Sequence, residues 1–294
     1  MHFLATLLLL TATQLAAAAP TPTLAALLAR GDYDAAVARA RRMPDSYLGE
    51  LIARAESLHL HRDPEWRALL HDHRTWLGRP VSEVDGRNFF TSRRGKYDPH
   101  QELLCTLASF FSRRPVPPTR QSPQCRFRAR YTWLRERLRF DPERLPEQAC
   151  DTFQAFHDAA DPVGITVVFP SSHPNSPSSM FGHLLVRFDG RGHAGAARML
   201  DYTVNYAAEA GGAAGATYAV KGLTGGFPGR FRIIPYHMKL REYAQMENRD
   251  LWEYRLRLPQ PVVERVFEHA WELAGTYFDY YFFTENCAYH LLSL

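Results

Sequence analysis

The chain has 294 residues, of which 46% are hydrophobic, 13% aromatic and 22% charged, and its formal net charge is +4. This composition excludes a disordered chain, and four cysteines are too few for a disulfide-dense mini-scaffold. The 35 basic and 31 acidic residues are intermixed along the chain, which argues against nucleic acid as a partner. A chain of this length forms one large or two ordinary domains.

The first residues have the pattern of an export signal. Residues 3–10 are an apolar run that is too short to span a bilayer reliably, and small residues follow it. Ala16-Ala17-Ala18 supplies a cleavage pattern, so we expect residues 1–19 to be a signal peptide and the rest of the chain to be periplasmic. Because no lysine or arginine precedes the run, an uncleaved membrane anchor is the alternative. No later stretch has 18 consecutive apolar residues.

Residues 20–113 are expected to be a helical region. Apolar residues recur with helical spacing in three segments, and Gly31-Asp32 and residues 43–46 separate these segments as helix breaks and caps. The segments are residues 24–30, 33–43 and 46–60. Residues 98–113 have a further amphipathic pattern that begins with Asp98-Pro99. Residues 114–162 are predicted to be a Pro/Arg/Ser-rich linker followed by helical segments at residues 129–137 and 150–160.

From residue 163 the pattern changes to that of strands and turns. Residues 164–170 are a β-branched run bounded by glycine and proline, which predicts a buried strand. Residues 182–188 and 197–207 predict two more strands that form a hairpin, and residues 261–276 predict a helix with Pro261 in its first turn. The predicted fold class is therefore α+β, in which a helical region precedes a domain, residues 163–294, with an antiparallel sheet.

Cys287 is the first candidate for chemistry. It follows the polar residues Thr284-Glu285-Asn286 and precedes a short apolar segment, a pattern typical of a helix N-terminus. The helix dipole and free N–H groups at such a position stabilise a thiolate, which lowers the pKa of the thiol and makes the sulfur a nucleophile. The alternative is a small packing residue on a buried helix.

His183 is the second candidate, because it directly follows Gly182 at the start of a predicted strand. A strand holds such a histidine rigidly while it faces solvent, as a general base requires; the alternative is an ordinary strand-end histidine. A cysteine at a helix start and a histidine on a strand are the minimal nucleophile–base dyad. A third polar residue should orient the imidazole. Asp201 and Asn205 share the same side-chain parity on the neighbouring strand, so the hairpin register decides between them, and we favour Asp201.

Metal binding is a weaker interpretation of the same histidines. His173, His183 and His193 are spaced ten residues apart, and Asp201 could join them as a ligand. This spacing fits no compact metal pattern, and His193 is predicted to lie in a turn. We therefore expect neither a metal nor another cofactor.

The other cysteines fit structural roles. Cys125 and Cys150 favour a disulfide, because the chain is predicted to be exported and has no C-x-x-C pair. Cys105 lies on the apolar face of its predicted helix and is expected to be a free buried thiol. The aromatic run at residues 277–283 predicts an apolar wall for an acyl chain, a surface that contacts lipid, or a buried strand.

Five segments together resemble the N-terminal periplasmic domain of the Lnb-type bacterial lipoprotein N-acyltransferases. The resemblance covers about residues 98–294, and its motifs occur in the family's order. The segments are Val168-Phe169-Pro170 with residues 175–183, residues 200–205, residues 221–227, residues 247–254, and residues 280–289. The order of a histidine on a strand and a cysteine on a later helix is also similar to permuted papain-like acyltransferases such as lecithin retinol acyltransferase. The resemblance therefore implies a permuted papain-like, NlpC-type fold.

The resemblance also implies a thioester mechanism. His183 would deprotonate Cys287, whose sulfur would attack an ester of a phospholipid acyl donor at the membrane surface. Backbone N–H groups at the helix start would hold the oxyanion. The acyl group would then pass to the N-terminal amine of a diacylglyceryl lipoprotein acceptor. Ala288 stands where the family often has a serine.

The length of the last helix is a further departure. Only seven residues follow Cys287, which is short for a helix that supports a nucleophile by packing on a sheet. We therefore expect the domain to be truncated at its C-terminus, since members of the family often continue into transmembrane helices.

Two other functions fit the same residues. A papain-like cysteine hydrolase would use the dyad to cut an amide or an ester, with water as the acceptor. A non-enzymatic envelope interaction module would bind a partner through its helical half, and the dyad would be structural.

Overall fold

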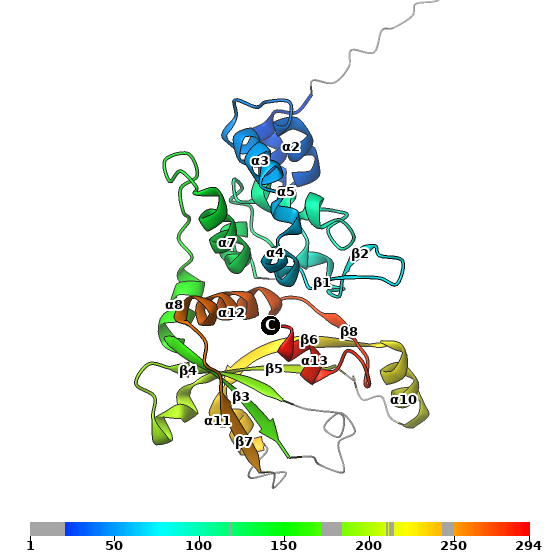
Figure 1. Cartoon of the computed structure of the whole chain (residues 1–294), viewed down its shortest axis with the longest axis vertical. Helices are drawn as coiled ribbons and strands as arrows, with labels where there is room; N and C mark the ends of the chain where they lie inside the picture. The colour runs from blue at the N-terminus through cyan, green and yellow to red at the C-terminus, as the bar shows by residue number, and fades with distance from the viewer. Residues whose placement is uncertain (1–20, 118, 172–183, 210, 212–214, 243–249) are drawn as a thin grey trace, which may run out of the picture.

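The computed structural model describes residues 21–117, 119–171, 184–209, 211, 215–242 and 250–294. The predicted signal peptide, His173 and His183 lie outside the described residues. Figure 1 shows the helical region at the top, the sheet at the bottom, and α12 (Gln260–Leu273) between the two. Within the part of the chain that the structure describes, no helix combines the length and the apolar composition needed to cross a bilayer.

The helical region begins its helices where the sequence supplies caps. The side chains of five residues each accept a hydrogen bond from a backbone N–H in the first turn of the helix that follows; they are Thr23, Asp32, Ser46, Asp63 and Asp98. Gly31 ends the first helix in the left-handed conformation, with φ 77°. The elements are α1 (Leu24–Arg30), α2 (Tyr33–Ala40), α3 (Tyr47–Ser57), η1 (Leu60–Arg62), α4 (Pro64–Leu69), the hairpin of β1 (Asp72–Arg74) and β2 (Pro80–Ser82), η2 (Arg87–Phe89), and α5 (Pro99–Ser109). The predicted helix breaks at Gly31-Asp32 and residues 43–46 are confirmed.

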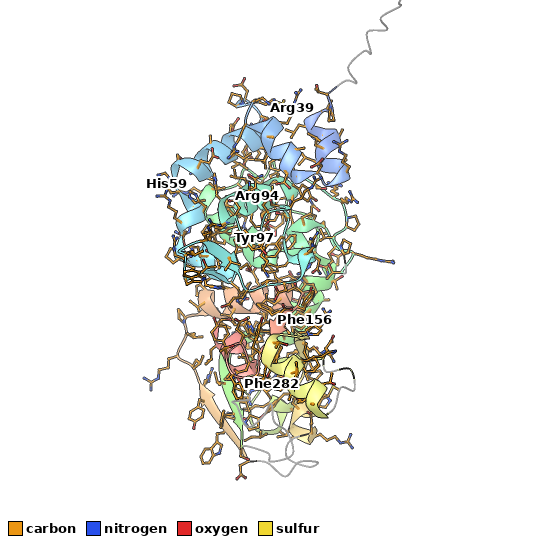
Figure 2. All side chains as sticks on the ribbon, turned by 90° about the vertical axis from the view of Figure 1, so that its right-hand side faces the viewer. Arg39, His59, Arg94, Tyr97, Phe156 and Phe282 are labelled. Carbon is orange, nitrogen blue, oxygen red and sulfur yellow. A yellow bond between two sulfur atoms is a disulfide. The ribbon has the colours of Figure 1, made fainter. Side chains whose placement is uncertain are left out.

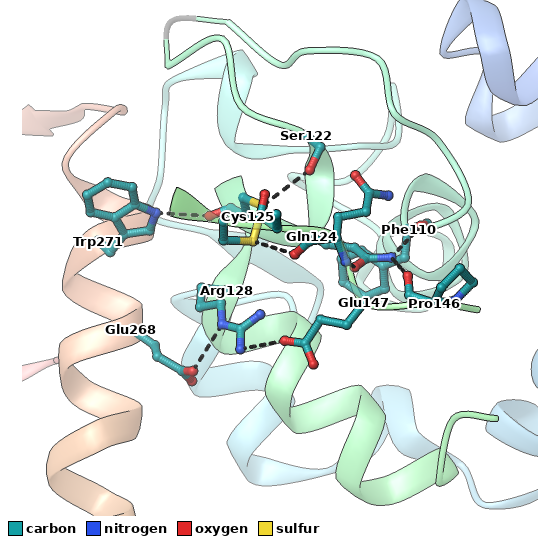
Figure 3. Close-up of a disulfide and its surroundings, with 12 residues drawn as sticks. Phe110, Ser122, Gln124, Cys125, Arg128, Pro146, Glu147, Glu268 and Trp271 are labelled. Atoms are coloured by element: carbon teal, nitrogen blue, oxygen red, sulfur yellow. Dashed lines mark hydrogen bonds and ion pairs between the residues drawn. A yellow bond between two sulfur atoms is a disulfide. The ribbon is translucent and has the colours of Figure 1, made fainter. Parts of the chain in front are cut away.

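A disulfide ties together the segment that follows. This segment contains α6 (Pro123–Arg126), α7 (Arg128–Leu138) and α8 (Asp151–Ala160). The predicted bond between Cys125 and Cys150 is present, with the two Cα atoms 5.2 Å apart (Figure 3). The indole N–H of Trp271, on α12, donates to the backbone oxygen of Cys125 at 3.0 Å. The disulfide therefore lies against the helix that covers the sheet.

The rest of the chain builds an antiparallel sheet of six strands. Their order is β7-β3-β4-β5-β6-β8, and every neighbouring pair is antiparallel. The elements are β3 (Pro162–Pro170), β4 (Leu185–Gly190), η3 (Gly195–Leu200), β5 (Tyr202–Ala208), α10 (Gly215–Thr224), β6 (Phe227–Pro235), α11 (Tyr236–Leu240), β7 (Leu251–Arg255), α12, β8 (Phe278–Tyr280) and α13 (Cys287–Leu292). The predicted α+β class is confirmed.

The strand expected at residues 197–207 is shorter than predicted. Residues 195–200 form the 3-10 helix η3, in which no residue is buried, and β5 begins at Tyr202. The change follows burial, because the four residues from Thr203 to Tyr206 are all buried whereas none of the η3 residues is. The predicted hairpin of β4 and β5 is present, and its register pairs Val186 with Val204.

One hydrophobic core runs from the helical region into the sheet. In the upper part, the rings of Trp66 and Trp133 stack with centroids 5.6 Å apart. In the lower part, Phe267 of α12 lies 4.8 Å from Phe156 and 5.0 Å from Phe188 of β4, measured between ring centroids. All five belong to, or pack against, a single cluster of buried side chains. Figure 2, which labels Phe156 near the middle of the molecule, shows side chains filling the level at which the two halves meet.

Candidate active site

Cys287 is the first residue of α13, as the sequence predicts. Asn286 caps this helix, because its side-chain oxygen accepts hydrogen bonds from the N–H groups of Ala288 at 3.1 Å and Tyr289 at 3.2 Å. Two of the N–H groups at the helix start are therefore already engaged, and the helix has only six residues. An oxyanion at this site needs at least one donor from another element.

The sulfur of Cys287 is buried beside two tyrosines. Only 2% of the residue is exposed, and the hydroxyl of Tyr280, on β8, lies 3.2 Å from the sulfur. Tyr206, on β5, stacks on Tyr280 with ring centroids 5.8 Å apart. The hydroxyl of Tyr206 is buried and has no hydrogen-bond partner among the described residues. The hydroxyl of Tyr280 therefore contacts the thiol, and the ring of Tyr206 packs on Tyr280.

Burial raises the pKa of Cys287 above the ordinary value of a thiol, although the hydrogen bond with Tyr280 and the charge of Lys239 act in the opposite direction. The sequence predicts a lowered pKa from the helix start. Desolvation of the sulfur outweighs that effect, so the resting group is a thiol. A base must therefore remove its proton as the sulfur reacts.

The predicted base, His183, lies outside the described residues, and its role stays a prediction. In the sequence it stands two residues before Leu185, the first residue of β4. β4 pairs with β5, and α13 packs on β5 through the rings of Tyr206 and His290, whose centroids are 4.7 Å apart. In the sequence, His183 therefore precedes β4, which is the neighbour of β5, and the helix of the nucleophile, α13, packs on β5.

Asp201 lies at the start of β5 and binds the turn that follows β4. Its carboxylate is completely buried, and it accepts hydrogen bonds from the N–H of Gly190 at 3.0 Å and from Nδ1 of His193 at 2.6 Å. Nε of Arg187 is 3.5 Å away. These contacts hold the two ends of the turn together. Among the described contacts, none joins Asp201 to Cys287.

Asn205, the other candidate for the third residue, lies in the middle of β5. It has the same side-chain parity as Asp201 and the opposite parity to Tyr206, whose ring packs on α13. Asn205 is 6% exposed, and its side-chain oxygen has no hydrogen-bond partner in the described part of the chain. The structure therefore leaves one buried acceptor on β5.

The histidines of the metal interpretation are not brought together by any described contact. His193 hydrogen-bonds to Asp201, and His173 and His183 are outside the described residues. Within the described ranges, no group of three or more His, Cys, Asp or Glu side chains could hold a metal ion.

Sequence reasoning missed the polar groups that the helical region places beside α13. His71, Glu83 and Ser293 contribute to these contacts, and His71 also lies 3.0 Å from His269 of α12, measured between their Nε2 atoms. No local pattern in the sequence singles these residues out. Their partners are distant in the chain, so the spacing of residues gives no indication of them.

The two free thiols should differ in reactivity. Cys105 is free and buried, as predicted. Burial raises its pKa and the charges of Glu102 and Asp34 raise it further, whereas Tyr280 and Lys239 oppose the effect of burial at Cys287. In the folded protein, we expect iodoacetamide to label Cys287 faster than Cys105. We also expect the rate at Cys287 to rise about tenfold for each pH unit between 7 and 9, because the thiolate fraction grows in that proportion below the pKa.

Quantitative mass spectrometry of the two cysteine peptides measures both rates, with the denatured chain as the control for intrinsic reactivity. Equal or slower labelling of Cys287, or a rate that does not depend on pH, contradicts the placement of the thiol described above.

One family model matches the half of the chain that contains the six-stranded sheet. Residues 152–294 match the Lnb N-terminal periplasmic domain. The match supports an Lnb-type family for this part of the chain and a periplasmic location. The matched range includes Cys287, Tyr280, Asp201, Asn205 and all six strands of the sheet.

A second family model matches the helical half. Residues 58–137 match a domain of unknown function, DUF7843, and this range contains His71, Glu83 and the α5 and α7 helices. The chain matches no curated protein and no solved structure. The two parts of the chain that match these family models pack against each other in one hydrophobic core.

Proposed function

We propose that the protein is a periplasmic cysteine acyltransferase. It moves an acyl chain from a phospholipid, through a thioester on Cys287, to the N-terminal amine of a diacylglyceryl lipoprotein. The observation that carries the proposal is a free cysteine, buried at a helix start against the hydroxyl of Tyr280, within the region that matches the Lnb domain. A permuted papain-like arrangement of helix and sheet is part of the proposal.

In the first half-reaction, His183 takes the proton of the Cys287 thiol as the sulfur attacks the ester carbonyl of the phospholipid. The C–O bond then breaks, the lysophospholipid oxygen leaves with the proton from His183, and the acyl group remains on sulfur as a thioester. The raised pKa of Cys287 requires this concerted proton removal. The hydroxyl of Tyr280, 3.2 Å from the sulfur, supplies a donor next to the reacting atoms.

In the second half-reaction, the amine of the lipoprotein attacks the thioester carbonyl. The C–S bond breaks, and the proton of the amine passes through His183 to the sulfur, which restores the thiol. Asn205 is the better candidate to orient His183, because the side-chain oxygen of Asn205 has no described partner whereas the carboxylate of Asp201 already binds Gly190 and His193. Asp201 supports the site through the turn that it holds.

An acceptor assay tests the proposal. The purified protein is mixed with detergent micelles that contain a phospholipid with an isotope-labelled acyl chain and a synthetic diacylglyceryl lipopeptide with a free N-terminal amine. We expect mass spectrometry to show the labelled acyl group on that amine and an equal amount of lysophospholipid. A lipopeptide with an acetylated N-terminus is the matched control and should gain no label.

The other functions give different products in the same assay. Labelled free fatty acid without acylated peptide identifies a hydrolase, since water is then the acceptor. Release of neither product, with the lipopeptide and phospholipid both intact, contradicts an enzyme of either kind and leaves the envelope interaction module.

A further inference from the structure

A segment of the helical half runs along the last strand of the sheet. Val84 forms a β-bridge with Phe278 of β8, and the N–H of Asp279 donates to the carboxylate of Asp85 at 2.7 Å. The N–H groups of Asp85 and Gly86 both donate to the backbone oxygen of Tyr277, at 3.0 and 3.1 Å. Because β8 is an outer strand of the sheet, this segment covers an edge that would otherwise have unpaired backbone groups.

Two side chains from the same part of the helical half reach α13 itself. The hydroxyl of Tyr289 donates to the carboxylate of Glu83. At the other end of α13, the hydroxyl of Ser293 lies 3.3 Å from Nδ1 of His71. The N–H of Glu83 donates to the backbone oxygen of His71 at 3.0 Å, so the two contacts come from one local structure.

On the inner side of α13, the polar contact among the described residues is the one between the sulfur of Cys287 and the hydroxyl of Tyr280, and His290 adds none. His290 packs between Tyr206 and Phe278, with ring centroids 4.7 and 4.5 Å away, and neither of its ring nitrogens has a hydrogen-bond partner among the described residues. Burial lowers the pKa of His290 to about 3, so the ring is neutral and packs as an apolar group. Apolar packing alone is weakly directional, whereas a hydrogen bond to a carboxylate fixes an orientation.

A helix of six residues depends on such contacts for its orientation. Isolated helices of this length are unstable in water, because the first turn costs more free energy than the few later hydrogen bonds return. Tyr289 is two residues after Cys287, so a hydrogen bond from Tyr289 to a fixed carboxylate restrains the turn that carries the sulfur.

We propose that residues 58–137, the part of the chain that matches DUF7843, position the nucleophile. Glu83, assisted by His71, holds α13 so that the sulfur of Cys287 stays buried at the hydroxyl of Tyr280. Glu83 and His71 are positioning residues and do not touch the reacting atoms. The consequence for catalysis rests on the proposed function, but the position of the sulfur is measured independently of it.

Tyr289→Phe is the variant that tests the proposal. It removes one hydroxyl from a residue that is 43% exposed, so the fold is kept. Loss of the hydrogen bond should let the first turn of α13 open more often, which exposes the sulfur. We expect iodoacetamide to label Cys287 roughly three- to tenfold faster than in the wild type. In the acceptor assay, we expect kcat to fall by a similar factor while KM stays within about twofold.

Three further variants sharpen the test. Glu83→Gln keeps an acceptor for the Tyr289 hydroxyl and should retain the labelling rate of the wild type. Ser293→Ala combined with Tyr289→Phe removes both side-chain contacts and should accelerate labelling further. Tyr254→Phe, at an exposed tyrosine on β7, is the matched control and should change nothing.

The outcomes separate the two proposals. Unchanged labelling of Cys287 in both Tyr289→Phe and the double variant overturns the positioning role. Faster labelling with a melting temperature equal to the wild type supports it. If labelling accelerates but no protein, including the wild type, forms acylated peptide or fatty acid, the positioning role stands and the acyltransferase proposal fails.

Discussion

Replacing Cys287 by alanine is expected to reduce the formation of acylated lipopeptide by about 10⁴-fold or more, because the step through a thioester has no other nucleophile. The remaining cysteines offer no substitute. Cys105 is buried against Asp34, and Cys125 and Cys150 are joined in the disulfide. The measurement is the initial rate of labelled lipopeptide formation by mass spectrometry. The loss should appear in kcat and in kcat/KM alike, since the sulfur acts on the reacting carbonyl.

The controls for this variant come from the same chain. Cys105→Ser removes the other free thiol, far from the proposed site, and should keep at least half of the wild-type rate. The melting temperature of Cys287→Ala should remain within a few degrees of the wild type, because only one buried sulfur is lost. A Cys287→Ala protein that is folded and retains more than about one hundredth of the wild-type rate contradicts the thioester mechanism.

Replacing Arg130 by methionine is expected to destabilise the protein by about 3–5 kcal/mol, the usual cost of breaking a buried ion pair on one side. Arg130 lies on α7 and is fully buried between Glu102 of α5, at 3.1 Å, and Glu272 of α12, at 3.2 Å. Both carboxylates have no exposed surface. Without the guanidinium, the two buried carboxylates lose the cation that lies between them. Urea unfolding monitored by tryptophan fluorescence measures the loss as a lower midpoint at unchanged slope.

The loss should depend on pH in a definite direction. Burial raises the pKa of Glu102 despite the charge of Arg130. At Glu272 burial acts in the same direction, but the charge of Arg130, the contact with His269 and the N–H of Arg130 together lower the pKa. Removing Arg130 raises the folded-state pKa of both groups above the unfolded values. Such groups destabilise the fold when they are ionised and cease to do so once they are protonated. The loss of unfolding free energy in Arg130→Met should therefore shrink as the pH falls from 8 to 5.

Arg135→Met is the matched control for this prediction. Arg135 lies on the same helix and pairs with Glu147 at 2.9 Å, but 39% of its side chain is exposed. Solvent screens such a pair, and we expect a change in stability below about 0.5 kcal/mol at any pH between 5 and 8. A loss at Arg130 no larger than that at Arg135, or one that grows as the pH falls, contradicts the role assigned to the buried network.

Much of the fold follows from local sequence patterns. The helix predicted at residues 261–276 is α12 (Gln260–Leu273), with Pro261 in its first turn, and the β-branched run at residues 164–170 lies within β3. These elements were predictable because periodicity and capping act over a few residues. The order of the strands was not, because β7 returns to pair with β3 on one edge and β8 pairs with β6 on the other.

The candidate site was predictable only in part, for the same reason. The helix start at Cys287 follows from the polar residues before it, and Asn286 acts as the cap that this pattern indicates. The raised pKa of the thiol depends on how deeply the helix packs, and no local pattern encodes packing depth. Likewise, the sequence of α7 shows an arginine-rich helix, but the partners of Arg130 lie 28 and 142 residues away in the chain.

The contact between Glu83 and Tyr289 has a consequence for the order in which the molecule is assembled. The two residues are 206 positions apart, and a chain synthesised from its N-terminus presents Glu83 long before Tyr289. Contacts of such long range form late in folding, since a large loop must close first. The sulfur is therefore expected to reach its buried position only after both halves have folded and docked. Under the proposed function, an incomplete chain would hold no assembled reaction centre, and acyl transfer would begin only once the last helix has been made and packed.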